Sequence, residues 1–258
     1  IKKAIRDLTA KGATSFILDL QDNGGGYVSA AEDVIGLFPK AKSAYTYKDA
    51  LGEEIVYAKR QSLQFPPDTR VLINRYSASA SEMTAAALAD QKAAILYGER
   101  TYGKGTMQSF YELSDGSYLK LTMAQFAGPI ETAINEVGVK PHIETKEDAL
   151  HKAHADAIIE QYSQYKEYPS LNNVPVTKTF TVNFKGTVGT VPDDAIELVQ
   201  LGKNKIDIAI KKQGATLLVT PTQPLVSGEQ YMLLIHPKIK GLANNVLRKG
   251  SYLYITVK

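Results

Sequence analysis

A cluster of serines lies between two expected secondary-structure elements. Ser77, Ser79 and Ser81 alternate with alanine, after an apolar run that ends at Asn74 and before an alanine-rich run of helical character. A hydroxyl at a strand-to-helix corner is exposed, and the first amides of a helix lack intrahelical acceptors. Ser79 could therefore act as a nucleophile, with the amide of Ala80 pointing to where an oxyanion would form.

The same residues allow a purely structural interpretation. Ser79 and Glu82 stand in the relation of a capping box, in which each side chain accepts a hydrogen bond from the backbone amide of the other residue. A serine can cap a helix and act as a nucleophile at once, so the two interpretations are compatible.

A serine nucleophile needs a base, and lysine is the candidate that the local sequence favours. Lys104 lies between Gly103 and Gly105, which let the backbone approach a neighbouring segment. A lysine acts as a base only where burial or a nearby positive charge favours the neutral amine. The alternative is that Lys104 is an exposed loop charge. None of the four histidines lies in a glycine-framed or serine-rich segment. They are His142, His151, His154 and His236.

The amino-acid composition limits the catalytic and metal-binding groups that the chain can use. The chain has 258 residues, of which 44% are hydrophobic and 22% charged, and it contains no cysteine. Disulfides, thiolate zinc sites and a thiol nucleophile are excluded, so a nucleophile, if the chain has one, is an oxygen. A formal net charge of +3 is too small to indicate nucleic-acid binding. His151 and His154 would share a helix face, but no carboxylate motif accompanies them, and no metal site is predicted.

The elements around the serines and the lysine alternate between helix and strand patterns. The fold class expected for the first part of the chain is α/β with a mixed sheet. Helical patterns occupy 1–8, 28–38 and 79–90, buried strand patterns occupy 15–20, 70–74 and 94–98, and hairpins are expected at 43–59 and 106–125.

The pattern changes near residue 147. A polar helix is expected from 146 to about 165, and the proline- and asparagine-containing segment 168–175 is interpreted as a linker. Short strand patterns separated by turns then suggest a small β-sandwich. The expected organisation is a core at 1–147, a helix and linker at 148–175, and a sandwich at 176–258.

Four sequence blocks resemble the carboxyl-terminal processing peptidases, the tail-specific serine proteases of the S41 family. They occur in the family's order within about residues 1–145, and the serine block joined to Gly-Lys-Gly-Thr-Met-Gln is the most specific. The blocks are 16–26, 71–82, 98–108 and 113–122, with a weaker fifth at 134–142.

The resemblance implies a crotonase-like core and roles for individual residues. Ser79 would be the nucleophile, Lys104 the base and Gln108 the residue that supports the lysine. The amide of Ala80 and that of Gly25 or Gly26 would bind the oxyanion. The family implies no cofactor. Its substrates are polypeptides with accessible C-termini. Asp90 matches an acidic position of the family, but its distance along the helix from Ser79 argues against a direct role.

The chain departs from the family pattern in places that bear on activity. Gly24 stands where proline is usual and Tyr76 where glycine is usual. The family's substrate-gathering PDZ domain is not found in the sequence. The expectation is an extracytoplasmic serine endopeptidase of the bacterial envelope, and the alternative is an inert surface binding or scaffold protein built on a peptidase-like core.

The last eighty or so residues resemble bacterial immunoglobulin-like domains of cell-surface proteins. The resemblance rests on 216–231 and 241–246. It implies a spacer or attachment module that could contact anionic cell-wall polymers through its basic excess. The alternative is a stable sandwich with no binding role.

Overall fold

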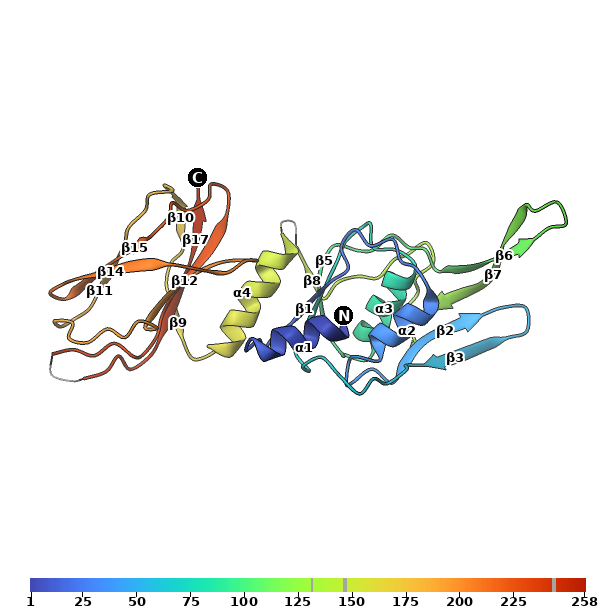
Figure 1. Cartoon of the computed structure of the whole chain (residues 1–258), viewed down its shortest axis with the longest axis horizontal. Coiled ribbons are helices and arrows are strands. Elements are labelled where there is room, and N and C mark those ends of the chain that lie inside the picture. The colour runs from blue at the N-terminus through green and yellow to red at the C-terminus, as the bar shows by residue number, and fades with distance from the viewer. Residues whose placement is uncertain (131, 146–147, 243–244) are drawn as a thin grey trace. The chain divides into compact units, whose positions relative to one another are not determined.

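The structure is a computed structural model that describes residues 1–130, 132–145, 148–242 and 245–258 (Figure 1). It divides into two compact units, Ile1–Ala149 and Leu150–Lys258. The expected boundary follows residue 147, and residues 146–147 lie outside the described residues. Residues 243–244, which belong to the sequence block 241–246, also lie outside them. Among the helices of the described ranges, none is long and apolar enough to cross a membrane.

A four-stranded parallel sheet is the framework of the first unit. Its strands lie in the order β1 (Ile17–Asp19), β4 (Arg70–Ile73), β5 (Ile95–Gly98) and β8 (Ile143–Glu144). Every residue of β4 is buried, as a central parallel strand covered on both faces requires. The strands expected at 15–20, 70–74 and 94–98 are confirmed. Since parallel strands end at one edge of a sheet, the segments that follow β1, β4 and β5 emerge there together.

The described part of this unit includes the helices α1 (Lys2–Ala10), α2 (Val28–Ile35) and α3 (Ala80–Asp90). In α3 every residue from Ala80 to Leu88 is buried. Such a helix packs on all sides, and its alanines let neighbouring elements approach closely. Helix α3 therefore fixes the position of the residue at its N-terminus.

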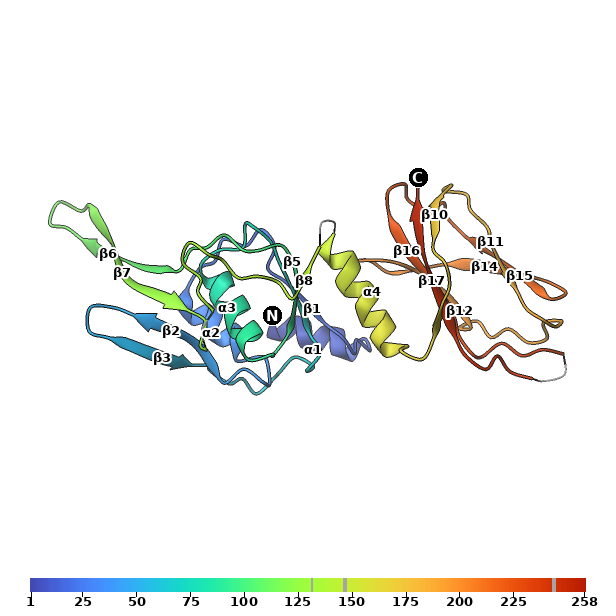
Figure 2. The same cartoon turned by 180° about the vertical axis from the view of Figure 1, so that it is seen from behind.

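A second, antiparallel sheet in this unit has the order β3-β2-β7-β6. Both expected hairpins are confirmed, one from β2 (Ser43–Lys48) and β3 (Glu53–Tyr57), the other from β6 (Thr106–Glu112) and β7 (Tyr118–Ala127). The β6–β7 hairpin extends away from the body of the unit (Figures 1 and 2). Its first strand begins two residues after Lys104.

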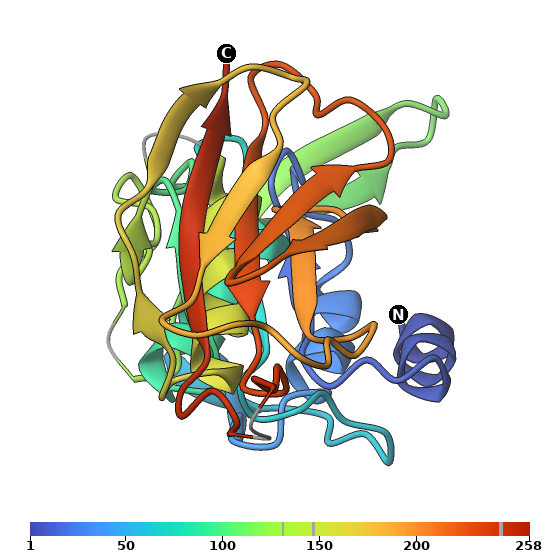
Figure 3. The same ribbon diagram turned by 90° about the vertical axis from the view of Figure 1, so that its left-hand side faces the viewer.

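The second unit contains two sheets and a helix (Figure 3). One sheet has the order β10-β17-β16-β12-β13, with β9 also paired to β17, and the other has the order β11-β15-β14. One face of the larger sheet packs against α4 (Ala149–Gln161). The other face contributes to a core shared with the smaller sheet. The strands are β9 (Lys166–Glu167), β10 (Leu171–Val174), β11 (Phe180–Asn183), β12 (Ile196–Gln200), β13 (Lys205–Ile206), β14 (Ile208–Gln213), β15 (Thr216–Pro221), β16 (Gln230–Ile235) and β17 (Ser251–Val257).

The segment 168–175, interpreted as a linker from its sequence, differs in the structure. It contains β10, and both β9 and β10 pair in parallel with β17. The pairing is irregular between Leu171 and Val174, where Asn173 has a φ of 54°. An edge strand with a bulge tolerates proline and asparagine, because one side of its backbone is left unpaired. Proline and asparagine therefore suggest a turn in this segment, whereas the chain forms an edge strand of the sheet here.

Candidate active site

Ser79 lies at the corner between β4 and α3 and is the N-cap of the helix. Its backbone has φ 57° and ψ −116°, a conformation that residues with a side chain rarely adopt. Ser79 is half-buried between the buried residues Ala78 and Ala80. A strained turn of this kind presents its side chain outward at the end of a strand.

The other two serines of the cluster are buried. The Ser77 hydroxyl donates a hydrogen bond to the Leu20 carbonyl at 2.7 Å and accepts one from the Asn74 amide at 3.0 Å. Asn74 in turn bonds to the amide and side chain of Asp22. Ser77 therefore joins the ends of β1 and β4. Of the three serines, only Ser79 has an incompletely buried side chain.

The glycine loop after β1 lies directly against Ser79. The Ala78 amide donates to the Asn23 carbonyl at 3.0 Å. Gly25 has a φ of 97°, and a Cβ at this position would lie 2.6 Å from the Ala78 oxygen, 2.8 Å from the Ala80 nitrogen and 2.9 Å from the Ser79 Cβ. Only glycine fits here, because each of these contacts is far inside van der Waals distance.

The amides of this loop differ in their partners. The Gly25 amide donates to Asn23 Oδ1 at 3.0 Å. Within the described residues, the amides of Gly26 and Ala80 have no hydrogen-bond acceptor. Of the three predicted oxyanion donors, the Ala80 and Gly26 amides are therefore not engaged within the described residues, whereas the Gly25 amide is bonded within its own loop.

Glu82, on the first turn of α3, connects the serine corner to the lysine loop. Its side chain is fully buried. Oε2 accepts the Ser79 amide at 2.8 Å and the Lys104 amide at 2.8 Å. The two backbone nitrogens therefore lie within twice that distance of each other. Oε1 accepts the Thr101 hydroxyl at 2.6 Å and the Gly103 amide at 2.6 Å.

The lysine loop is also held from its other side, by residues of the fifth sequence block. The Thr101 amide donates to the Val139 carbonyl at 3.1 Å, and the Val139 amide donates to the Thr101 hydroxyl at 2.6 Å. The Glu136 amide donates to the Gly103 carbonyl at 2.8 Å. Backbone contacts therefore fix Lys104 on two sides. The sequence marked the blocks 98–108 and 134–142 only by resemblance and gave no sign that Thr101 bonds to Val139.

The side chains of Lys104 and Gln108 are half-buried. Gln108 Nε2 donates to Thr106 Oγ1 at 2.8 Å, and the pairing of β6 with β7 shifts register between Met107 and Gln108. In the part of the chain that the structure describes, no hydrogen bond joins the Lys104 side chain to Ser79 or Gln108. The structure thus brings the backbones of Ser79 and Lys104 together.

The remaining candidates have other contacts. At the far end of α3, Asp90 accepts hydrogen bonds from the Ile130 amide at 3.0 Å and from the Thr132 hydroxyl. His142 Nδ1 accepts the Leu96 amide, and His154 Nδ1 accepts the Gly202 amide. Burial lowers the pKa of His154, and repulsion from His151 lowers it further.

His236 bonds to the Tyr165 hydroxyl at 2.7 Å. Over the described ranges there is no group of three or more histidine, cysteine, aspartate or glutamate residues that could hold a metal.

Comparison with known proteins shows the family to which the first unit is similar. A family model described as "Peptidase family S41" matches residues 1–145. Carboxyl-terminal-processing peptidase 2, chloroplastic, of Arabidopsis thaliana is 42% identical over 145 residues, which are 55% of this chain and 28% of the relative. A probable CtpA-like serine protease of Staphylococcus aureus (strain N315) is 32% identical over 185 residues, 70% of this chain and 34% of the relative. The chain thus spans about a third of the length of these relatives.

Among solved structures, a photosystem II D1 C-terminal processing protease has 35% sequence identity and a TM-score of 0.53, covering 58% of this chain and 39% of that one. The first unit accordingly has an α/β core of the ClpP/crotonase-like class, with parallel and antiparallel sheets. The chain belongs to peptidase family S41.

Replacing Glu82 tests whether its carboxylate holds the two loops together. Glu82→Gln presents an amide NH₂ group to donors that need an acceptor, so the free energy of unfolding of the first unit should fall by roughly 2–4 kcal/mol. Urea unfolding followed by circular dichroism measures this change. The exposed Glu99→Gln is the matched control and should stay within about 0.5 kcal/mol of the unsubstituted protein. An equally small effect at Glu82 would contradict the assignment.

Proposed function

We propose that the chain is a serine endopeptidase that cleaves polypeptides near their C-termini through a Ser79–Lys104 dyad. The observation that carries the proposal is the contact of one carboxylate oxygen of Glu82 with the backbone amides of both residues. Membership of family S41 supports the reaction class. The four-carbon stem of a lysine can span the short distance between the two backbones.

In the proposed first step, the neutral Lys104 amine removes the proton from Ser79 Oγ as the oxygen attacks a peptide carbonyl. The amides of Ala80 and Gly26, which have no acceptor among the described residues, would stabilise the negative charge on the carbonyl oxygen. The C–N bond then breaks, and the amine product takes the proton from Lys104. This leaves the acyl group on Ser79.

In the second step, water attacks the acyl group, and Lys104 accepts a proton from the water and returns one to Ser79 Oγ. The proposed chemistry needs no cofactor. Gln108 would support the neutral amine with its amide oxygen, which the bond from its Nε2 to Thr106 does not use.

Substitution of the dyad gives a direct test. Ser79→Ala and Lys104→Ala should each lower kcat/KM for an unstructured, fluorescently labelled polypeptide by at least about a thousandfold, because each removes one half of the proton transfer. The melting temperature of Lys104→Ala should be unchanged, whereas Ser79→Ala should lower it by a few degrees because it removes the hydroxyl at the N-cap of α3. Lys120→Ala, on the exposed part of β7, is the control and should retain activity. Full activity of Lys104→Ala would end the dyad assignment.

An inert binding or scaffold protein is the alternative function. It would be favoured if the purified chain bound cell-wall material but left every unstructured polypeptide intact, including when its core is joined to the additional regions that longer relatives possess.

The glycine loop offers a second test with a control in the same loop. Gly25→Ala places a methyl group against the backbone of Ala78 and Ala80, at a positive φ, and should reduce kcat at least about a hundredfold. Gly24→Ala places its methyl group in open space and should keep more than roughly half of the activity. Both are measured with the same polypeptide substrate. Equal activities of the two variants would show that the loop does not shape the site.

For the second unit, we propose an immunoglobulin-like sandwich that serves as a spacer or attachment module in the bacterial envelope. Two sheets that share one apolar core support the architecture. The expectation of an extracytoplasmic location and of contact with anionic wall polymers rests on the sequence resemblance alone. Co-sedimentation of the chain with purified cell walls tests the contact, and its absence at low salt would contradict it.

A further inference from the structure

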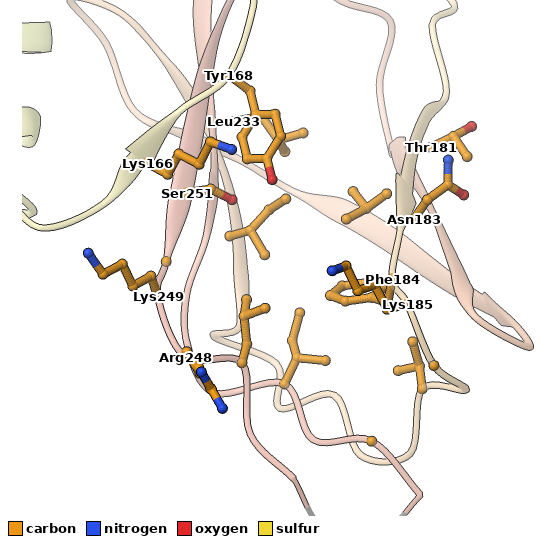
Figure 4. Close-up of a pocket in the computed structure, with 18 of the residues that line it drawn as sticks. Lys166, Tyr168, Thr181, Asn183, Phe184, Lys185, Leu233, Arg248, Lys249 and Ser251 are labelled. Atoms are coloured by element: carbon orange, nitrogen blue, oxygen red, sulfur yellow. The ribbon is translucent and has the colours of Figure 1, made fainter.

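The second unit contains a large cavity that the proposed peptidase chemistry does not use. Its volume is about 1030 Å³, at the upper end of the range for ligand-binding pockets. It lies on the open side of the sandwich, between β11 of the smaller sheet and the β9–β17 side of the larger one (Figure 4). All its lining residues belong to this unit.

The inner walls of the cavity are apolar. Val182, Phe184, Ile235 and Leu253 line it, and each is only partly buried although it packs against the sandwich core. Figure 4 shows Phe184 extending from the β11 side toward the middle of the cavity. These side chains would lose water-accessible surface if a ligand with apolar groups entered.

One wall is the free edge of a β-strand. Among the described strands, β11 pairs with β15 alone and ends its sheet. Consecutive residues from Phe180 to Val188 all line the cavity. Because side chains alternate between the two faces of a strand, a strand that showed a face would contribute only every second residue. β11 therefore presents its edge, with its outward backbone groups, to the cavity.

The cavity is strongly basic. Its described lining includes six cationic residues and no acidic residue, the cations being Lys166, Lys178, Lys185, Lys240, Arg248 and Lys249. Within the described ranges, none of the six is in an ion pair. The Lys166 amine instead lies 4.7 Å from the centre of the Tyr168 ring. Unpaired cations around an apolar cavity favour an anionic ligand.

We propose that this cavity is a docking groove for an extended, acidic segment of the polypeptide substrate, which adds a strand to the edge of β11. A peptide has the three required features, since its backbone pairs with a strand edge, its alternate apolar side chains enter the cavity, and its acidic side chains meet the cations. A strand paired with all four residues of β11 would be about 13 Å long. The identification of the ligand as substrate rests on the proposed peptidase function.

Binding is tested with the full chain carrying Ser79→Ala, so that the result does not depend on cleavage. The probe is a short fluorescein-labelled peptide that alternates valine and glutamate, and fluorescence anisotropy measures its Kd. The same peptide with lysine in place of glutamate should bind at least about tenfold more weakly. A version with every backbone nitrogen methylated should also bind at least about tenfold more weakly, because it has no N–H group left to donate to a strand edge.

Charge reversal on the protein locates the site. Lys185→Glu and Arg248→Glu should each raise the Kd of the glutamate peptide about fivefold or more. Lys211→Glu makes the same change of charge at an exposed residue of β14 outside the cavity, and it should leave the Kd within about twofold. Equal effects of all three substitutions on the Kd, or equal Kd values for the methylated and unmethylated glutamate peptides, would contradict the proposed docking groove.

Cleavage tests the assignment of the ligand as substrate. With Ser79 intact, Lys185→Glu should raise KM severalfold for a polypeptide that carries the acidic segment and leave kcat unchanged. An unchanged KM alongside specific peptide binding would overturn that assignment. Specific peptide binding by a chain that cleaves nothing would instead contradict the peptidase function and leave the groove in place.

Two other occupants would overturn the proposal. Binding to phosphatidylglycerol vesicles that is lost in both charge-reversal variants, without binding of the peptide, would assign the cavity to a membrane surface. Concentration-dependent dimerisation in sedimentation, abolished by the same variants, would assign it to a second copy of the chain.

Discussion

The arrangement of the candidate active site depends on one buried carboxylate. Glu82 has no access to solvent, and its two oxygens accept hydrogen bonds from four donors on two separate segments. A buried charge is tolerated only when it is fully hydrogen-bonded, so the carboxylate requires both segments to be in place. Ser79 and the loop that carries Lys104 are consequently positioned by the same group, and a movement of either would leave the buried carboxylate with fewer hydrogen bonds.

The topology of the parallel sheet makes this arrangement possible. The glycine loop follows β1, the serine corner follows β4, and the lysine loop comes a few residues after β5, so all three begin at one edge of the sheet. The buried, alanine-rich α3 then fixes the angle at which Ser79 leaves the corner. The positive φ of Ser79 is maintained because the structure on both sides of it is rigid.

Much of the first unit could be predicted from its sequence, because its strands, helices and hairpins have strong local patterns. The capping relation of Ser79 and Glu82 is local too. The bonds from Glu82 to residues 101–104 join segments about twenty residues apart, and no periodicity reveals them. The two hydrogen bonds between Thr101 and Val139 could not be predicted from the sequence for the same reason. In the second unit, proline and asparagine indicated a linker where an irregular edge strand lies, and the cavity beside β11 depends on how the two sheets pack.

The Glu82 carboxylate holds the backbone of the site and does not bond to its reactive side chains. At positions 79, 103 and 104 it bonds to main-chain nitrogen atoms, which every residue except proline possesses. These three hydrogen bonds do not involve the side chains of Ser79 and Lys104. Cysteine could replace the nucleophile, and histidine the base, without loss of these hydrogen bonds. The scaffold is therefore a ready starting point for redesign, in which new reactivity is installed while the supporting architecture is left untouched.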